Sequence, residues 1–254
     1  AIRKSNEKLH SIASNYKIIK SNFVYIKDIL EKEGIKEVDG ILMDLGVSSP
    51  QFDEGDRGFS YRSDYPLDMR MDQENNPLTA KKIVNTYSYQ ELCRIFREYG
   101  DEKYASSIAN NIIKARREKE IETTFQLVDN IKASKPQKEL KKVGHPAKQV
   151  FQALRIEVND ELNVLRKAIK DVTPFLRRGG GRIAIITFHS GEDKIVKKIF
   201  QELAISQGSR IDIPLKQEEK EFKEINHKVI TASLEEQEIN PRSKSAKLRI
   251  LERK

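Results

Sequence analysis

The first 45 residues alternate between the apolar spacing of helices and the apolar runs of strands. Residues 1–13 carry apolar side chains at helical spacing, and residues 16–20 predict a short strand. Residues 23–33 predict a short helix that ends at Gly34, and residues 38–45 predict a buried strand. Helix, strand, helix, strand is the order that forms a parallel sheet with crossover helices. The pattern therefore predicts an α/β fold.

Residues 46–76 break this alternation because they are rich in Gly, Ser, Asp and Pro. A loop of this length in a compact domain is usually functional or disordered. Disordered segments are normally poor in aromatic side chains. The aromatic side chains and methionines of this loop favour an ordered and functional segment; they are Phe52, Phe59, Tyr61, Tyr65, Met69 and Met71.

Residues 79–134 carry apolar side chains at helical spacing, with short connections and no strand pattern. Residues 135–142 then predict a charged linker that contains one proline. Because strand patterns lie on both sides, we expect the helices to form an insertion between two strands of the sheet. The expected sheet domain comprises residues 1–66 and 146–254, and the expected all-helical insertion comprises residues 67–145.

Helical spacing resumes at Ala147 and produces two stripes on one predicted helix. The apolar stripe predicts core packing and consists of Phe151, Leu154, Val158, Leu162 and Leu165. The polar stripe beside it consists of Lys148, Gln152, Arg155 and Asn159. Amide and guanidinium groups beside a buried seam often line a cleft, and a solvated helix edge is the alternative.

The last third of the chain predicts a second buried strand and two shorter ones. Three glycines at residues 179–181 lead into an apolar run at residues 182–188, and His189 follows this run. A helix comes next, and the shorter strands are expected at residues 228–232 and 246–251. A basic turn with the sequence Asn-Pro-Arg-Ser-Lys-Ser separates these two strands.

Asp44 and His189 are the candidate chemical groups, because each stands at the end of a predicted buried strand. In open α/β sheets, ligands bind at the carboxyl ends of the strands. A carboxylate in this position can bind a ligand or only cap the loop. A histidine can act on a substrate or be satisfied by the backbone. The pattern alone leaves these alternatives open.

The chain of 254 residues carries a net charge of +8, which favours a polyanionic partner because Lys and Arg neutralise phosphates. No apolar run approaches the roughly 18 residues that span a membrane. The single cysteine, Cys93, predicts a small core residue, and one cysteine fits a reducing compartment such as the cytoplasm. We expect no metal site because the histidines are scattered, at His10, His145, His189 and His227.

Seven segments, in this order, resemble the MraW-type methyltransferases, which methylate the N4 atom of a cytosine in bacterial small-subunit ribosomal RNA. The resemblance covers essentially the whole chain. The segments are Asp44-Leu-Gly-Val-Ser-Ser-Pro-Gln51, Arg57-Gly-Phe-Ser60, Pro66-Leu-Asp-Met-Arg-Met-Asp72, His145-Pro-Ala, Phe151-Gln-Ala-Leu-Arg-Ile-Glu-Val-Asn-Asp-Glu-Leu162, Phe188-His-Ser190, and Asn240-Pro-Arg242 with Ser245-Ala-Lys-Leu-Arg249.

The resemblance implies a Rossmann-like fold that uses S-adenosylmethionine (SAM), with a helical domain inserted after the fourth strand. It implies a cofactor site that includes Phe23, Asp44 and Gln51. With the positions at the strand ends, it makes Asp44 and His189 the candidate catalytic residues. The expected partner is small-subunit ribosomal RNA or the assembled small subunit, and a homodimer is compatible with the sequence.

The chain also departs from the family pattern. The family's first strand, its Gly-Gly-His loop and the acid that holds the SAM ribose correspond to residues before Ala1. We therefore expect an N-terminally incomplete SAM-binding sheet and weak SAM affinity for the chain as printed. Gly191 stands where the family usually has Leu, Lys148-Gln149 stand where it usually has Thr-Arg, and Lys244 replaces a usual Arg.

The expected reaction is difficult because the lone pair of the cytosine amine is delocalised into the ring. An acceptor for the amine N–H and an in-line methyl group favour transfer, and Asp44 and His189 are the candidates. Asp44 could accept from the amine or hold the cofactor, and the family pattern favours the cofactor contact. His189 could orient the base or receive a proton. Phe52, Phe59 and Tyr61 could stack on the unstacked base. The candidates for binding RNA phosphates are Arg57, Arg70, Arg155, Arg242 and Lys244.

Two other functions remain compatible with the residues. One is RNA binding without catalysis, by a fragment that lacks the glycine loop. The other is methylation of a DNA amino group. DNA amino-methyltransferases usually carry Asp/Asn-Pro-Pro-Tyr/Phe at this strand end, whereas this chain has Asp-Leu-Gly-Val.

Overall fold

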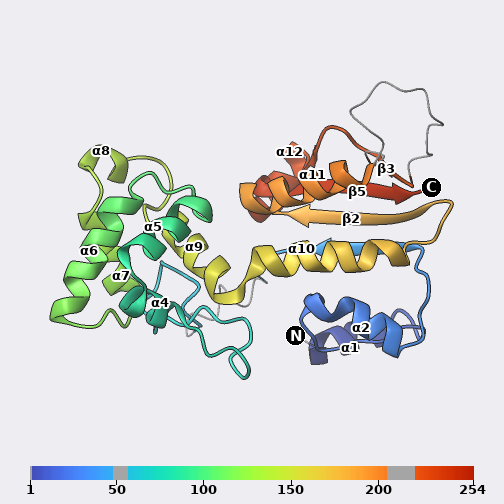
Figure 1. The fold of residues 1–254 in the computed structure, drawn as a ribbon, viewed down its shortest axis with the longest axis horizontal. Helices are drawn as coiled ribbons and strands as arrows, with labels where there is room; N and C mark the ends of the chain where they lie inside the picture. Colours follow the sequence, from blue (N-terminus) through green and yellow to red (C-terminus); the bar gives the residue numbers. More distant parts are fainter. Residues whose placement is uncertain (1, 48–56, 205–220) are drawn as a thin grey trace, which may run out of the picture. The chain divides into compact units, whose positions relative to one another are not determined.

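The computed structural model describes residues 2–47, 57–204 and 221–254 (Figure 1). Its internal contacts divide the chain into two compact units, a sheet unit and a helical unit. The sheet unit consists of Ala1–Met43, Val164–Ile186 and Glu192–Lys254, and the helical unit consists of Asp44–Asn163 and Thr187–Gly191.

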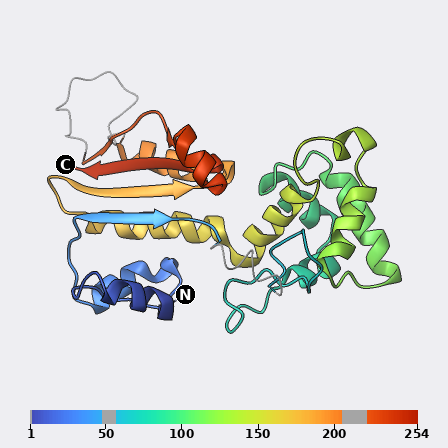
Figure 2. The ribbon, with the colours of Figure 1, turned by 180° about the vertical axis from the view of Figure 1, so that it is seen from behind.

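The sheet unit is built on a mixed sheet, which confirms the predicted α/β class. The strand order is β1 (Gly40–Asp44), β2 (Gly181–Thr187), β5 (Lys247–Arg253) and β3 (Phe222–Glu224), and β4 (Ile230–Thr231) also pairs with β5. Figure 2 shows β1 and β2 running in the same direction and β5 running in the opposite direction. Strands β3 and β4 are antiparallel to β5. The two late strands predicted from the sequence are thereby confirmed as β4 and β5.

Two helices cover one face of this sheet. Helices α10 (Glu161–Val172) and α11 (Ser190–Ala204) lie in front of the strands in Figure 1 and behind them in Figure 2. Burial of one large apolar side chain contributes about 1.5–3 kcal/mol, so the shared core holds the helices in place. The buried side chains include Ile183 and Ile185 of β2, Leu165 and Ile169 of α10, and Val196 and Phe200 of α11.

A polar pair adds a directional link between α11 and β5. Arg249 Nε donates to Asp193 Oδ1 at 2.7 Å, and Lys247 Nζ lies 3.4 Å from Asp193 Oδ2. Burial raises the pKa of the Asp193 carboxyl, but the hydrogen bond from Arg249 and the nearby charges outweigh it and leave the pKa below its ordinary value. The Lys-Leu-Arg249 motif therefore stabilises the sheet unit.

In the first 45 residues, one strand prediction is wrong and another is only partly confirmed. Residues 16–20 are not a strand, because no described strand lies beside them to complete a ladder. The run at residues 38–45 does form β1, but β1 is the edge strand of the described sheet and Leu42 is 70% exposed. The predicted helices are confirmed as α1 (Ile2–His10) and as η1 (Phe23–Tyr25) with α2 (Ile26–Lys32).

The helical unit has its own core, as the periodicity of residues 79–134 predicts. Capping boxes begin two of its helices, at Ser88 with Glu91 and at Thr123 with Gln126. Its core includes Phe96 and Cys93, which is buried as expected. Its helices are α4 (Ala80–Thr86), α5 (Tyr89–Glu98), α6 (Ala105–Glu118), α7 (Thr124–Ala133), α8 (Gln137–Leu140) and α9 (Lys148–Asn159).

The helical unit is larger than the insertion expected at residues 67–145. Helix α9 belongs to it, because Val150 and Phe151 join the core formed with α5 and α6. The ordered part of the long loop also belongs to it, because Phe59, Leu67 and Met69 are buried in the same core. A hydrophobic pattern shows which face is buried but does not name the partner that buries it.

The helix predicted from Ala147 onward is interrupted. Asp160 adopts the left-handed conformation (φ 49°), which ends α9, and α10 begins at Glu161. Asn and Asp are the non-glycine residues that adopt this conformation most readily. The apolar stripe is nevertheless buried on both helices, so the predicted core role is confirmed.

The predicted charged linker at residues 135–142 begins with a buried ion pair. Lys135 Nζ lies 2.6 Å from Glu102 Oε2, and the two side chains are only 7% and 3% exposed. The same Nζ donates to the backbone carbonyl of Pro146 at 2.7 Å. Among the helices of the described residues, none is both long enough and apolar enough to cross a lipid bilayer.

The remaining elements are short. Helix α12 (Leu234–Ile239) precedes the 3-10 turn η4 (Pro241–Ser245), and the turn η3 (Thr173–Phe175) follows α10. The Asn240 side chain accepts a hydrogen bond from the Arg242 backbone, which begins η4. The basic turn predicted between the two late strands is thus an ordered turn.

We expect Lys135→Met to lower the free energy of unfolding of the helical unit by about 3–5 kcal/mol, because Glu102 would stay buried without a counter-charge. Lys81→Met is the control, since the Lys81–Glu122 pair is 39% and 49% exposed and should contribute less than about 1 kcal/mol. Urea unfolding with hydrogen exchange in the helical unit measures both variants. Equal losses would contradict a special role for the buried pair.

Candidate functional site

Asp44 is the last residue of β1 and its side chain is exposed. The turn after it requires Gly46, whose φ of +92° is unfavourable for other residues. A Cβ atom at Gly46 would lie 3.7 Å from the Phe188 ring. Phe188 and His189 follow β2, so the loops after two neighbouring strands meet. The structure therefore brings together the two segments in which the sequence predicted chemistry.

His189 is half-buried beside Gly191. A Cβ atom at Gly191 would lie 3.2 Å from the imidazole Nδ1 and Cε1 atoms. The glycine at this position, where the family usually has Leu, therefore leaves space for the imidazole. The Ser190 hydroxyl donates to Asp101 Oδ2 at 2.8 Å, which anchors the segment that carries His189 to the helical unit.

Glu161 is a site residue that the sequence did not single out. One of its carboxylate oxygens lies within 4.8 Å of a His189 ring nitrogen. Arg155 donates to both oxygens of Glu161, at 2.8 and 2.9 Å, in a forked geometry that holds the carboxylate rigidly. Imidazole and carboxylate are also common metal ligands, so the absence of a metal stays a prediction.

Two of the three predicted cofactor residues lie in the described part of the chain, and both are exposed. Phe23 lies in η1 and is 40% exposed, and the Asn22 side chain caps this turn. Asp44 is exposed, as described above. Gln51 lies outside the described residues, as does Phe52. The cofactor roles of Phe23, Asp44 and Gln51 stay predictions.

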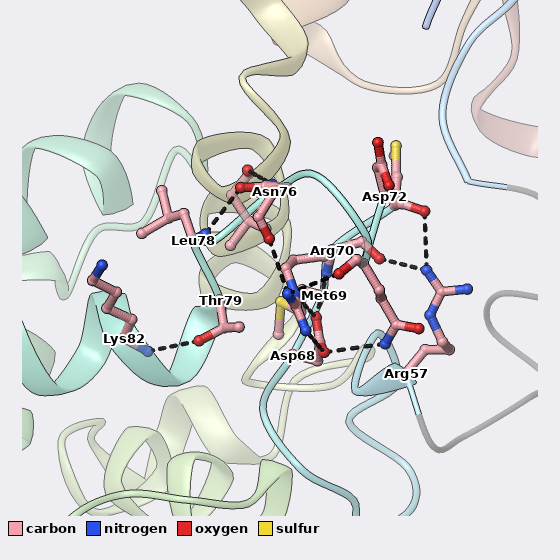
Figure 3. A network of polar contacts seen from close by, with 12 residues as sticks. Arg57, Asp68, Met69, Arg70, Asp72, Asn76, Leu78, Thr79 and Lys82 are labelled. Carbon is pink, nitrogen blue, oxygen red and sulfur yellow. Dashed lines mark hydrogen bonds and ion pairs between the residues drawn. The ribbon is translucent and has the colours of Figure 1, made fainter. Parts of the chain in front are cut away.

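Arg57 and Arg70 are engaged within the protein (Figure 3). Arg70 donates to both oxygens of Asp68 at 2.8 Å and to the Asn76 carbonyl at 2.9 Å. Arg57 donates to the backbone carbonyls of Arg70 and Met71. These contacts order the Pro-Leu-Asp-Met-Arg-Met-Asp motif. They favour a structural role for both guanidinium groups over the predicted contact with RNA phosphates.

Asn159 and Asn76 join this motif to α9. Asn159 accepts from the Met71 backbone at 2.7 Å and donates to the Met69 carbonyl at 2.8 Å, and Asn76 donates to the Val158 carbonyl at 2.7 Å. Both asparagines are partly buried, so the loss of one of these hydrogen bonds would leave a buried polar group without a partner and destabilise the fold. The polar stripe of α9 therefore includes a tether to the long loop.

The close approach of the loop to itself requires Gly58. Its φ is +68°, and a Cβ atom there would lie 2.3 Å from the Pro66 carbonyl oxygen. The following Phe59 is buried, so it cannot stack on a base as predicted without leaving the core. Tyr61 stacks instead on the His145 ring, with ring centroids 4.3 Å apart. Phe59 and Tyr61 thus contribute to packing.

The remaining predicted RNA-binding residues lie in different settings. Arg155 is held by Glu161, and the pair is only 14% and 10% exposed. Arg242 and Lys244 lie in η4 with exposed side chains. Their exposure is compatible with phosphate contact, and their roles stay predictions.

Asp68 gives the loop an acid-sensitive contact. Burial raises the pKa of its carboxyl, but hydrogen bonds from Arg70 and Gln73 outweigh burial and leave the pKa below its ordinary value. Because the folded pKa is the lower one, Asp68 stabilises the fold above about pH 4, and this contribution is lost as the pH falls through the folded pKa.

We therefore expect Asp68→Asn to destabilise the protein at pH 7 and to differ less from the wild type at pH 3. Urea unfolding across this pH range measures the difference. Asp129→Asn, which changes an exposed carboxylate on α7, is the control and should show little difference at either pH. A constant deficit for Asp68→Asn from pH 7 to pH 3 would contradict the role of its charge.

The whole chain, residues 1–254, matches the family model described as the MraW methylase family. A Spiroplasma kunkelii protein named "Ribosomal RNA small subunit methyltransferase H" is 54% identical over 94% of this chain and 77% of its own length. Proteins of the same name from Mesoplasma florum and Clostridioides difficile are 51% and 49% identical, and each match covers 100% of this chain and 82% and 81% of the respective relative. The chain therefore belongs to the MraW methylase family, as its seven segments predicted.

Proposed function

We propose that this protein transfers a methyl group from SAM to the exocyclic N4 atom of a cytosine in small-subunit ribosomal RNA. The observation that carries the proposal is the meeting of the loops after β1 and β2, which places Asp44 and His189 on neighbouring strand ends. The relatives named as ribosomal RNA small subunit methyltransferases support the choice of substrate.

Two of the predicted cofactor residues, which belong to different units, carry groups suited to binding SAM. Phe23 offers a partly exposed aromatic face for the adenine ring, and Asp44 offers an exposed carboxylate beside a turn without side-chain bulk at Gly46. SAM supplies, when bound, a methyl group on a positively charged sulfur. The remaining requirement is a base held with its amine correctly oriented.

Asp44 and His189 meet this requirement. An ionised carboxylate has two acceptor oxygens, so Asp44 can accept a hydrogen bond from the cytosine amine and another from the cofactor. A hydrogen bond from the amine N–H to a carboxylate increases the electron density on the nitrogen and holds the amine so that its lone pair can face the methyl group. His189 orients the base and receives the proton that the amine loses. The Glu161 carboxylate, held by Arg155, lies within 4.8 Å of a His189 ring nitrogen and would help to keep the imidazole in place.

The backbone after Asp44 argues against a DNA amino-methyltransferase. Those enzymes usually place a proline at the position of Gly46. Proline holds φ near −65°, whereas Gly46 has a φ of +92°. The Asp-Leu-Gly-Val turn is therefore a different backbone structure from an Asp-Pro-Pro-Tyr turn.

Methyl transfer tests the proposal directly. The protein produced from its natural gene is incubated with labelled SAM and unmethylated small subunits, and the RNA is digested to nucleosides. We expect label in N4-methylcytidine. Label in uridine or on a cytosine ring carbon would contradict the proposed reaction. RNA binding with no label would support the non-catalytic alternative.

Asp44→Ala should abolish methyl transfer and change the free energy of unfolding by less than about 0.5 kcal/mol, because the side chain is exposed. Asp39→Ala is the matched control. Asp39 precedes β1, is also exposed and pairs with Arg177 on the surface. It should keep the activity. A large loss of stability with normal activity in Asp44→Ala would show that Asp44 only caps the loop.

A further inference from the structure

The basic residues of the helical unit differ in whether the protein itself engages their charge. Arg57, Arg70 and Arg155 donate to carbonyls and carboxylates of the protein itself. Residues 130–148, by contrast, contain six lysines and one glutamate, a net charge of +5 in a chain whose net charge is +8. Of these lysines, Lys135 pairs with Glu102 and Lys142 with Glu139, and the others form no ion pair with a described residue. Charges already engaged inside the protein are poor candidates for a polyanionic partner, so the lysine-rich segment is the better one.

The buried ion pair closes this segment into a loop. Lys135 contacts both Glu102 and the Pro146 carbonyl, so residues 136–145 leave and return at the same point. We call residues 136–145 the lysine loop. The hydrogen bond from the Ser107 hydroxyl to the Ser134 carbonyl, at 3.0 Å, also fastens its base to α6. Because its base is anchored, the loop presents its cations from a stable support.

Cations from other segments lie beside the lysine loop. His145, the last residue of the lysine loop, stacks on Tyr61, and Arg62 follows Tyr61 in the chain. Burial and then the charges of Lys132, Arg62 and Lys135 lower the pKa of His145, so these cations are its neighbours. The charges of Lys103 and Lys138 likewise act on Glu139, after the hydrogen bond from Lys142, and lower its pKa. Four separate parts of the chain therefore contribute to one basic surface.

We propose that this lysine surface binds the phosphate backbone of the ribosomal RNA substrate. The surface is defined by Arg62, Lys103, Lys132, Lys138, Lys141 and Lys142. The proposal rests on the proposed function and locates the RNA contact on the α7–α8 side of the helical unit.

The chemistry of the surface fits phosphate better than base recognition. Lys132, Lys138 and Lys141 are exposed and form no ion pair with any residue that the structure describes. A lysine ammonium is a hydrated point charge on a flexible stem, which suits contacts that do not read sequence. Such contacts supply affinity, and the residues at the strand ends are left to select the base.

The test compares two triple variants of the protein produced from its natural gene. One carries Lys132→Gln, Lys138→Gln and Lys141→Gln. The control carries Lys82→Gln, Lys114→Gln and Lys119→Gln, which removes the same charge from exposed positions on α4 and at the end of α6. Binding to a small-subunit ribosomal RNA transcript and to assembled small subunits is measured across a salt series, and thermal unfolding verifies that both variants fold.

For the first variant, we expect the slope of log affinity against log salt to fall by about two to three units, with about a ten- to hundredfold loss of affinity near 0.15 M salt. The control variant should keep most of the wild-type salt slope and most of the wild-type affinity. Equal effects in the two variants would overturn the proposal, because net charge alone would then explain them. A loss with assembled subunits but none with the naked transcript would also overturn it and would indicate contact with a ribosomal protein.

The binding comparison does not depend on methyl transfer, so the two proposals can fail separately. A wild-type protein that makes no N4-methylcytidine would refute the proposed reaction. A difference in salt dependence between the variants would still support RNA binding by the lysine surface.

Discussion

The side-chain amide of Asn159 holds the long loop of the helical unit against the end of α9. Its oxygen accepts from the Met71 backbone, and its nitrogen donates to the carbonyls of Met69 and Arg155, all within 2.9 Å. Asn159 ends α9, so together with Asn76, which donates to the Val158 carbonyl, it joins the long loop to the core helix. Met69 has a φ of 64°, a conformation that costs of order 1–3 kcal/mol for such a residue. Burial of its side chain and the Asn159 bond offset this cost.

The same end of α9 also determines the geometry of the candidate site. The chain turns through the left-handed Asp160, and Glu161 follows directly. Arg155, one turn before Asn159, reaches this glutamate and holds it near His189. The loop, the helix end and the imidazole are therefore linked by consecutive contacts. A change at Asn159 would therefore disturb the backbone that positions Glu161.

Sequence patterns predicted what depends on neighbouring residues and missed what depends on distant ones. The helices of residues 79–134 and the strand ends at Asp44 and His189 follow from local periodicity and composition. The strand expected at residues 16–20 failed because a ladder needs a partner strand. The burial of Lys135 was missed because its partner, Glu102, lies 33 residues away. The break at Asp160 was missed because the helical spacing of apolar residues continues across it, from Val158 to Leu162.

Charge shows this limit most clearly, because a sequence gives the sign of a side chain but not its partner. Arginine presents a planar fork that matches carboxylates and carbonyls, and the motif arginines use it to order the long loop. Lysine keeps its hydration and its mobility, and the exposed lysines beside α8 keep their charge available to solvent. The chemistry proposed at the strand ends would need the rigidity that these arginines give to the neighbouring loop and to Glu161. Attraction of a long polyanion needs only positive charge at an accessible surface, so a loop anchored at its base is sufficient for it.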